Sequence, residues 1–440
     1  MYFPFGRQPE LHPVGGADGV TGTQTSWLVV FVSLLLTAPA LAQQSMPLTL
    51  AEVEDHAVAS EPGQQALLAK AAALTERGVV AGELPDPMLR LGLNNYPIQS
   101  GGFSTEAMTN AAVGLRQEFP AGDTRALSTR RFNFLAGEMN QNAAARGRNV
   151  LTAARQAWLD VYYWEQAQVL VTESRPLFDD LLTISRSLYA VGRKSQQDVL
   201  RAELELSRLD DRLIEIERQQ SHARAALGEW IGDAADRPIV HKLPAWSAVP
   251  PIESMHSMLL QHPVLQAADA QIEAQETGVE LAKQRSKPNW AIDVGYSYRD
   301  GSLPSGDPRS DMVSVGVTVG LPFFRKKSVD GSLSAALQDR SAAKSSREQG
   351  YRRLQSQLEA EYARWQDLGR RLSLYDEQIL DLAKDNAEAA LLAYQSDRGD
   401  FADVMRAHID DLNTRIAHIR LQVERAQSYA VLANLGDLPR

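Results

Sequence analysis

Two pairs of short segments alternate between apolar and polar residues, which is the pattern of a strand with one apolar face. In the clearest segment, 290–298, every second residue is Trp, Ile, Val or Tyr, and in 313–321 every second residue is Val or Leu. Segments 88–93 and 113–119 give a weaker version of the same pattern. Turn-forming residues separate the members of each pair, so the pattern predicts β-hairpins at 88–119 and 290–321.

Each hairpin is followed by a long stretch of helix-forming residues, 125–227 and 325–435. The first helix, 125–189, measures about 100 Å at 1.5 Å per residue, and Pro176 is expected to kink or interrupt it. Apolar residues then recur in alternating steps of three and four, which predicts antiparallel coiled-coil pairing. These residues are Val199, Ala202, Leu206, Leu209, Leu213 and Ile216, and then Ile409, Leu412, Ile416, Ile419 and Val423.

The chain is built twice, with repeats at 43–240 and 241–440. Pro62, Pro87 and Tyr189 recur about 200 residues later as prolines and a tyrosine in similar surroundings, and a D-V-x-R-A segment recurs near the end of each repeat. A period of this length indicates a duplicated domain rather than a solenoid. Each repeat has the same predicted order: a helix, a β-hairpin and a long helical hairpin.

The N-terminal residues 1–42 are predicted to be a signal peptide with a weak basic region. An apolar run at 27–36 precedes Ala40-Leu41-Ala42, a small-residue cleavage site, and the run is too short to span a bilayer. The alternative is a buried apolar segment of a cytosolic protein.

The predicted strands are about ten residues long, which is the length that crosses a membrane when tilted. Aromatic residues such as Trp290, Tyr298 and Phe323 lie near their ends, as in the aromatic girdles of membrane barrels. Four strands cannot close on themselves, so a membrane-spanning sheet requires an oligomer, and a dimer or a trimer gives an even strand number. The alternative is two soluble hairpins packed on helices.

Composition and motifs exclude several classes of function. The net charge of -10 argues against a protein that coats nucleic acid, and the absence of cysteine excludes disulfides and thiolate chemistry. His256 and His262, and His408 and His418, are not spaced to share a helical face as metal ligands. No catalytic motif is present, so we predict no catalytic residue, no metal site and no cofactor.

The turn inside each long helical hairpin carries the most informative motif. In YAVGRKSQQDVLRA, Gly192 ends the first helix, and in YQSDRGDFADVMRA, Gly399 and Asp400 do so. The pattern resembles the turns of TolC-type outer membrane efflux proteins, Y-x-x-G-x-x-x-x-x-D-V-L-x-A, and the likeness extends over nearly the whole mature chain. Segments 85–87, 108–109 and 117–120 resemble the heavy-metal branch of that family.

The resemblance implies a mixed, mainly α fold and a homotrimer in outer membrane lipid. It implies a 12-stranded transmembrane β-barrel continued by a long α-helical barrel across the periplasm. A protein of this kind is a passive exit duct of a tripartite efflux system, working with a periplasmic adaptor and an inner-membrane pump of the resistance-nodulation-division type. The heavy-metal branch implies metal cations as cargo.

By position, the resemblance places the periplasmic constriction at Asp198, Tyr394, Asp403 and Arg398. It places the adaptor-contacting tip at Val191, Gly192, Arg193 and Gly399. Three copies of a carboxylate on a three-fold axis attract cations, and a neighbouring arginine can hold the turns together. The second turn departs from the pattern, because Asp397 stands where the glycine is expected and the arginine position is shifted. The alternative for Asp198 and Asp403 is charge complementing a helix dipole.

Two other functions remain open on the sequence. One is a structural periplasmic coiled-coil scaffold with small β-hairpins. The other is an exit duct for organic drugs or secreted proteins. In neither case does the sequence predict an enzyme.

Overall fold

The computed structural model describes residues 46–59, 61–246 and 248–438. The predicted signal peptide, 1–42, lies outside these residues. The described part is mainly helical, which confirms that expectation. Its α-helices are α1 (Leu50–Ala59), α2 (Pro62–Gly82), α3 (Thr124–Ala190), α4 (Gln196–Ile231), α5 (Ile252–Leu259), α6 (Pro263–Gln284), α7 (Lys326–Leu374), α8 (Leu380–Gln395) and α9 (Phe401–Gly436).

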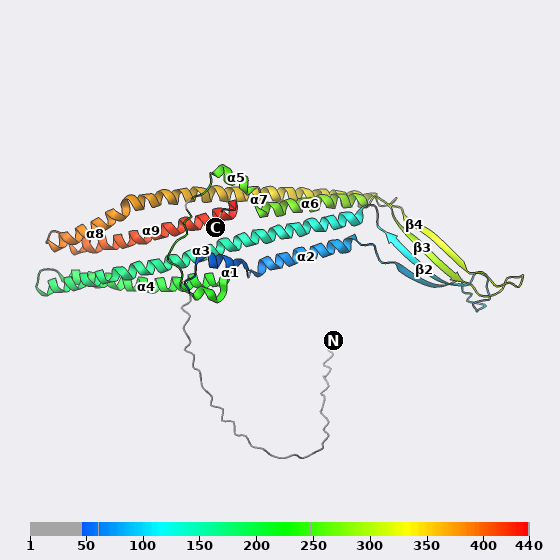
Figure 1. The fold of residues 1–440 in the computed structure, drawn as a ribbon, viewed down its shortest axis with the longest axis horizontal. Coiled ribbons are helices and arrows are strands. Elements are labelled where there is room, and N and C mark those ends of the chain that lie inside the picture. Colours follow the sequence, from blue (N-terminus) through cyan, green and yellow to red (C-terminus); the bar gives the residue numbers. More distant parts are fainter. Residues whose placement is uncertain (1–45, 60, 247, 439–440) are drawn as a thin grey trace, which may run out of the picture. The chain divides into compact units, whose positions relative to one another are not determined.

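Four strands form one antiparallel sheet in the order β1-β2-β3-β4. Their bounds are β1 (Met88–Asn94), β2 (Asn110–Phe119), β3 (Asn289–Tyr298) and β4 (Met312–Gly320). The central pairing joins β2 to β3, so strands from the two halves of the chain lie side by side. The outer edges of β1 and β4 have no strand partner among the described residues. Figure 1 shows the sheet at one end of the long helices and the turns of both helical hairpins at the other.

The two faces of the sheet differ in polarity. The register places Leu91, Val113, Tyr296 and Val313 in one row across all four strands. Alternate residues along each strand continue this apolar face, whose side chains are largely exposed, as in β4, where Val315 is 72% exposed. This chain therefore leaves a broad apolar surface uncovered, which in a soluble monomer is uncommon.

The opposite face carries charge. Asp293 of β3 lies 3.7 Å from Arg90 of β1 and 3.5 Å from Arg116 of β2, measured between carboxylate oxygen and guanidinium nitrogen. Its second oxygen accepts a hydrogen bond from the Thr318 hydroxyl on β4 at 3.1 Å. One carboxylate thus links all four strands on their polar face.

Helix α3 runs without a break through Pro176, so the expected interruption is wrong. A proline inside a helix loses one hydrogen bond, and its ring crowds the carbonyl four residues earlier; good packing of the helix can offset both costs. Phe178 and Leu181, just beyond the proline, are 1% exposed and belong to the main hydrophobic core. Packing against α4 and α9 therefore keeps the helix continuous.

The apolar residues spaced at three and four along α4 and α9 face this core. Ala202, Leu209 and Ile216 of α4 are buried, and Val199, Leu206 and Leu213 pack against them. In α9, Leu412, Ile416 and Val423 are buried in the same cluster. The core is therefore a long interface between helices rather than a central globule.

The second helical hairpin contains an irregularity that the sequence pattern did not indicate. A π-helical turn, Tyr375–Ile379, separates α7 from α8. Asp376 of this turn lies 2.7 Å from Nε2 of His418 on α9, and the Tyr375 ring stacks on the His418 ring with centroids 6.2 Å apart. The wider turn changes which residues face α9 without ending the helix.

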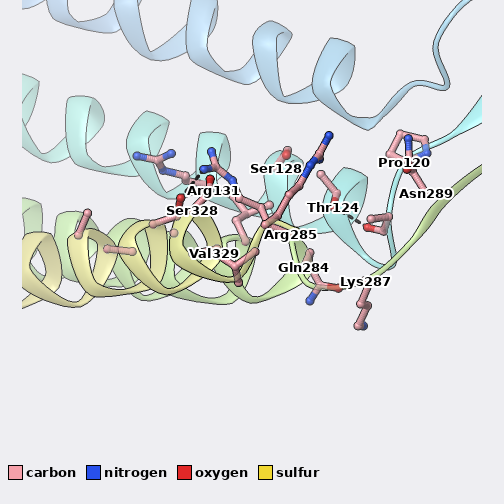
Figure 2. Close-up of a pocket in the computed structure, with 18 of the residues that line it drawn as sticks. Pro120, Thr124, Ser128, Arg131, Gln284, Arg285, Lys287, Asn289, Ser328 and Val329 are labelled. Atoms are coloured by element: carbon pink, nitrogen blue, oxygen red, sulfur yellow. Dashed lines mark hydrogen bonds between the residues drawn. The ribbon is translucent and has the colours of Figure 1, made fainter. Parts of the chain in front are cut away.

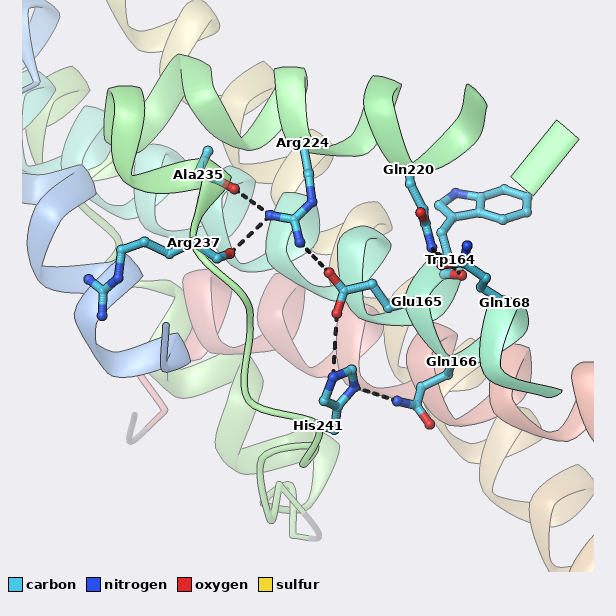
Figure 3. A network of polar contacts seen from close by, with 9 residues as sticks. All are labelled: Trp164, Glu165, Gln166, Gln168, Gln220, Arg224, Ala235, Arg237 and His241. Atoms are coloured by element: carbon cyan, nitrogen blue, oxygen red, sulfur yellow. Dashed lines mark hydrogen bonds and ion pairs between the residues drawn. The ribbon is translucent and has the colours of Figure 1, made fainter. Parts of the chain in front are cut away.

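A polar network fixes the segment that follows α4 (Figure 3). Arg224 of α4 donates to the carbonyl oxygens of Ala235 and Arg237 at 2.7 and 3.0 Å, and its other terminal nitrogen donates to Glu165 of α3. His241 lies 3.7 Å from the second oxygen of Glu165. The connecting segment is thus held against both helices of the first hairpin.

Candidate functional site at the helical hairpin turns

The turn between α3 and α4 is closed by a glycine in the left-handed region. Gly192 has a φ of 72°, and its N–H donates to the Tyr189 carbonyl at 2.9 Å. The next N–H, of Arg193, donates to the Leu188 carbonyl at 2.9 Å. This is the Schellman pattern, which satisfies the last carbonyls of a helix and favours glycine because a Cβ is disfavoured at this φ.

Helix α4 then begins with a side-chain cap. The backbone N–H of Ser195 donates to the Asp198 carboxylate at 3.4 Å, which places a negative charge in the first turn of the helix. An acidic side chain there stabilises the positive end of the helix dipole. Within one chain, therefore, Asp198 has the capping role that was the alternative to a place in the constriction.

The second turn has the same backbone pattern with aspartate in place of glycine. Asp397 has a φ of 60°, and its N–H donates to the Tyr394 carbonyl at 3.1 Å, while the Arg398 N–H donates to Ala393 at 2.9 Å. Aspartate is one of the few residues besides glycine that tolerate this region. At Gly399 the constraint is space rather than the backbone angle, because a Cβ at this position would lie 3.1 Å from the Cβ of Ala393.

Lys194 links the two turns. Its Nζ lies 3.0 Å from the Asp397 carboxylate and 4.9 Å from the centroid of the Tyr394 ring. The Tyr394 ring is 3% exposed and lies 5.4 Å from the ring of Phe401, the first residue of α9. We call the Lys194–Asp397 ion pair with its Tyr394 contact the turn clasp.

The electrostatics of these groups follow from their contacts. The Lys194 ammonium lowers the pKa of Asp397, and the Asp397 carboxylate raises the pKa of Lys194. Burial raises the pKa of Tyr394, and the charge of Asp198 adds to this effect. The Tyr394 hydroxyl is buried and has no hydrogen-bond partner among the described residues. Both ends of the clasp are therefore ionised over a wide range around neutral pH.

The structure brings together only part of the set expected for the constriction. Tyr394 is part of the clasp and Asp198 lies near it, whereas Asp403 pairs with Arg406 of its own helix at 3.0 Å. Arg398 makes no side-chain ion pair with any residue in the described part of the chain, so within one chain the link between the turns is made by Lys194. In the expected adaptor tip, Val191, Gly192 and Arg193 are exposed and Gly399 is half-buried.

Sequence reasoning placed Tyr394 at this end of the molecule but missed the two charged members of the clasp. It gave no role to Lys194, and it treated Asp397 only as a departure from the glycine pattern. A signal was present, because aspartate is one of the few residues that can replace glycine in the left-handed region and it also brings a charge opposite to Lys194. What the sequence lacked was the evidence that the two turns meet.

In the described ranges, no three His, Asp or Glu side chains group in a way that could hold a metal ion. None of the helices in those ranges combines the length and apolar character needed to cross a membrane.

The C-terminal part of the chain matches a known protein family. Residues 255–436 match the outer membrane efflux protein family. This match supports an outer-membrane location and a transport role without enzymatic chemistry. No curated protein matches the chain.

Solved structures share the fold. The outer-membrane channel OprN aligns with a TM-score of 0.74 and 16% identity, over 88% of this chain and 89% of OprN. The outer membrane protein VceC of Vibrio cholerae aligns with a TM-score of 0.73 and 16% identity, over 88% of this chain and 96% of VceC. The MtrE outer membrane channel of Neisseria gonorrhoeae, in an open state, aligns with a TM-score of 0.70 and 16% identity, over 88% of each chain.

The first turn yields a stability prediction. Replacing Gly192 with alanine places a Cβ at a φ of 72° with no atom within 4 Å, so the cost is purely conformational, roughly 1 kcal/mol. Gly137, inside α3, also has open space around a Cβ, and alanine there raises stability by roughly 0.5–1 kcal/mol. The midpoints of urea unfolding should therefore move in opposite directions. A Gly192→Ala variant as stable as Gly137→Ala would contradict the strained turn.

Proposed function

We propose that this protein is a passive outer-membrane exit duct of a tripartite efflux system, working as a homotrimer and exporting heavy-metal cations. The observation that carries the proposal is the four-stranded sheet, which has one continuous apolar face and two edges with no strand partner in the described part of the chain. The family match of residues 255–436 supports the efflux role. In such a system the energy comes from an inner-membrane pump of the resistance-nodulation-division type, reached through a periplasmic adaptor.

The edges of the sheet explain why more than one copy is needed, and the family resemblance makes that number three. In lipid, unpaired N–H and C=O groups have no water to bind, so a membrane-spanning sheet has to close. Strand β1 leads away from the helices and β4 leads back towards them, so β4 of one copy can pair antiparallel with β1 of the next. Three copies give twelve strands, with the apolar face outward and the Asp293 face inward.

The turns form the inner end of the proposed duct. Three copies of Asp198 and Asp403 near the three-fold axis make an acidic constriction that attracts cations, with Tyr394 and Arg398 beside it. The clasp holds the two turns of each chain together, so opening requires it to break. Val191, Gly192, Arg193 and Gly399 form the end that contacts the adaptor.

The cargo class follows from the resemblance to the heavy-metal branch. The residues that carry this resemblance have structural contacts in the sheet: the Gln117 amide donates to the Pro85 carbonyl at 2.8 Å, and the buried Thr109 hydroxyl donates to Asn95 at 2.9 Å. These contacts stabilise the first hairpin rather than bind cargo. Specificity is therefore expected to reside in the pump.

The apolar face gives a test of membrane insertion. Arginine at Val315, in the middle of β4, places a charge on the lipid side, which costs about 2–4 kcal/mol near the bilayer centre. Arginine at the neighbouring Ser314 points to the polar face and is tolerated. We expect Ser314→Arg to reach the outer-membrane fraction as a trimer and Val315→Arg to be lost from it, measured by density-gradient separation and native gels. Equal behaviour of the two variants, or a soluble wild type, would favour the scaffold.

The clasp gives a test of gating. The depressed pKa of Asp397 means that the clasp is complete above about 3.8 and is lost as the pH falls through the lower folded value. The raised pKa of Lys194 means that the clasp is complete below about 10.5 and is lost as the pH rises through the higher folded value. Single-channel conductance of the wild type should therefore stay low and constant from about pH 5 to 9. Asp397→Asn keeps a residue that tolerates the left-handed turn and removes the charge, so conductance should rise severalfold across that range.

The control for this experiment is Asp367→Asn. Asp367 pairs with Arg370 within α7, so the same change of charge is made without touching the turns. Conductance of this variant should equal that of the wild type. If Asp397→Asn also leaves the conductance unchanged, the clasp does not hold the duct closed.

The cargo is tested by deleting the gene and measuring tolerance to zinc, copper and detergents. We expect lower tolerance to the metals, restored by the wild-type gene and not by the Val315→Arg gene. Unchanged metal tolerance with greater sensitivity to detergents would replace metal cations by organic compounds as the cargo.

A further inference from the structure

A cavity of about 1000 Å³ lies where the sheet meets the long helices. Its walls come from the ends of β2 and β3 and from α3, α6 and α7, and Figure 2 draws the side chains that line it. Figure 1 shows that the sheet end of these helices lies opposite the hairpin turns. Nothing in the proposed duct assigns a role to it. Its lining combines cations, hydroxyl groups and apolar side chains.

Three arginines line this cavity, one from each helical element. They are Arg131 of α3, Arg285 at the end of α6 and Arg325 at the start of α7. None of the three forms an ion pair within the described part of the chain. Arg285 donates to the Ser332 hydroxyl at 2.7 Å, and the Nε of Arg131 is buried without a hydrogen-bond partner among the described residues. A buried guanidinium donor left unpaired is costly, which favours an acceptor in the cavity.

The carboxylates in the lining do not neutralise these arginines. Glu118 pairs with Arg116 at 3.3 Å, on the sheet. Asp339 lies fourteen residues beyond Arg325 on α7, a rise of about 21 Å along the helix. Lys287, a fourth cation of the lining, is paired with Asp123 at 3.6 Å. The end of the cavity near the sheet is therefore left with a positive charge.

Hydroxyl groups surround these cations. Thr124 and Ser128 of α3 and Ser328 and Ser332 of α7 line the same space, and Figure 2 shows Ser128, Ser328, Arg131 and Arg285 drawn between the three helices. Guanidinium groups together with hydroxyl donors are the set that binds phosphate oxygens. Helix α7 begins here with no acidic residue in its first turn, which adds to the positive potential, whereas Asp123 precedes the first turn of α3.

The residues beside the cavity include aromatic side chains of the kind found at a membrane–water interface. Phe323 and Phe324, just before Arg325, are 75% and 101% exposed, and Phe119 stacks on Trp290 with centroids 4.1 Å apart. Aromatic rings beside cations are typical of the boundary between lipid tails and headgroups. An anion that carries acyl chains could place its phosphate in the cavity and its chains along the apolar face of the sheet.

We propose that this cavity binds a phosphate group, held by Arg131, Arg285 and Arg325, and that the group belongs to a phospholipid of the membrane. Free phosphate would be bound by the same residues, and the experiments below distinguish it from a phospholipid. The phosphate site itself is independent of the duct, whereas the lipid as its source rests on the proposed insertion of the sheet.

The test uses the full-length protein purified in detergent and native mass spectrometry with added phosphatidylglycerol. Arg285→Gln/Arg325→Gln removes two of the cations from the cavity. Lys326→Gln/Lys327→Gln is the matched control, because these neighbouring lysines carry the same charge and do not line the cavity. We expect at least about tenfold weaker lipid binding for the arginine variant and unchanged binding for the lysine variant.

Two further ligands separate the possible sources. Diacylglycerol has the acyl chains without the phosphate and should not bind measurably at this site, while inorganic phosphate should displace the lipid in competition. If inorganic phosphate binds in calorimetry, depends on the same arginines, and phosphatidylglycerol does not bind, the site takes free phosphate. Equal lipid binding by the arginine and lysine variants, together with unchanged phosphate binding, would overturn the proposal.

Loss of assembly is separated from loss of the site by a second variant. Arg131→Gln removes a single guanidinium, and its trimer on a native gel and its conductance report the duct independently of the ligand. A trimeric, conducting Arg131→Gln protein that binds lipid as tightly as the wild type would count against the site and leave the proposed function intact.

Discussion

The antiparallel pairing of β2 with β3 is the contact on which the rest of the structure depends. It joins strands that lie about 180 residues apart in the chain and fixes their register from Ala111 with Tyr298 to Phe119 with Trp290. Helix α3 follows β2 and α7 follows β4, so both long helical pairs leave from the same end of the sheet (Figure 1). Since α3 and the run from Lys326 to Gln395 are of nearly equal length, their turns reach the same level about 100 Å away. The contact between Lys194 and Asp397 is possible only because these lengths match.

The same backbone turn is used twice with different residues, and the difference has a consequence for charge. Gly192 closes the first turn without a side chain, so Lys194 is free to reach across. Asp397 closes the second at a φ of 60° and presents a carboxylate at that position. A glycine in its place would relax the backbone and remove the partner of Lys194. The second turn thus has a less favourable backbone conformation than a glycine would give, but its aspartate makes an ion pair with Lys194 of the first turn.

Local patterns in the sequence predict the elements well, and the reason is physical. Alternation along 290–298 shows which face of the strand is apolar, and the steps of three and four along α4 show which face of the helix is buried. Both follow directly from strand and helix geometry. The interruption expected at Pro176 does not occur, because the cost of the proline is local, whereas the packing of Phe178 and Leu181 that offsets it is not. The clasp, the π-helical turn and the cavity each require residues far apart in sequence to be placed in space, which no local pattern supplies.

The exposure of the clasp suits a gate. Lys194 and Asp397 lie near water, where an ion pair is screened and contributes little to stability, and the cation–π contact with Tyr394 adds a modest amount. A buried pair would cost several kcal/mol to break and would hold the turns shut permanently. In the trimer we propose, the clasp occurs three times, so three weak contacts would hold the closed state and an adaptor bound at Val191 and Arg193 would still open it. On this proposal the apolar sheet at one end fixes the assembly, and the polar clasp at the other end leaves the turns able to change.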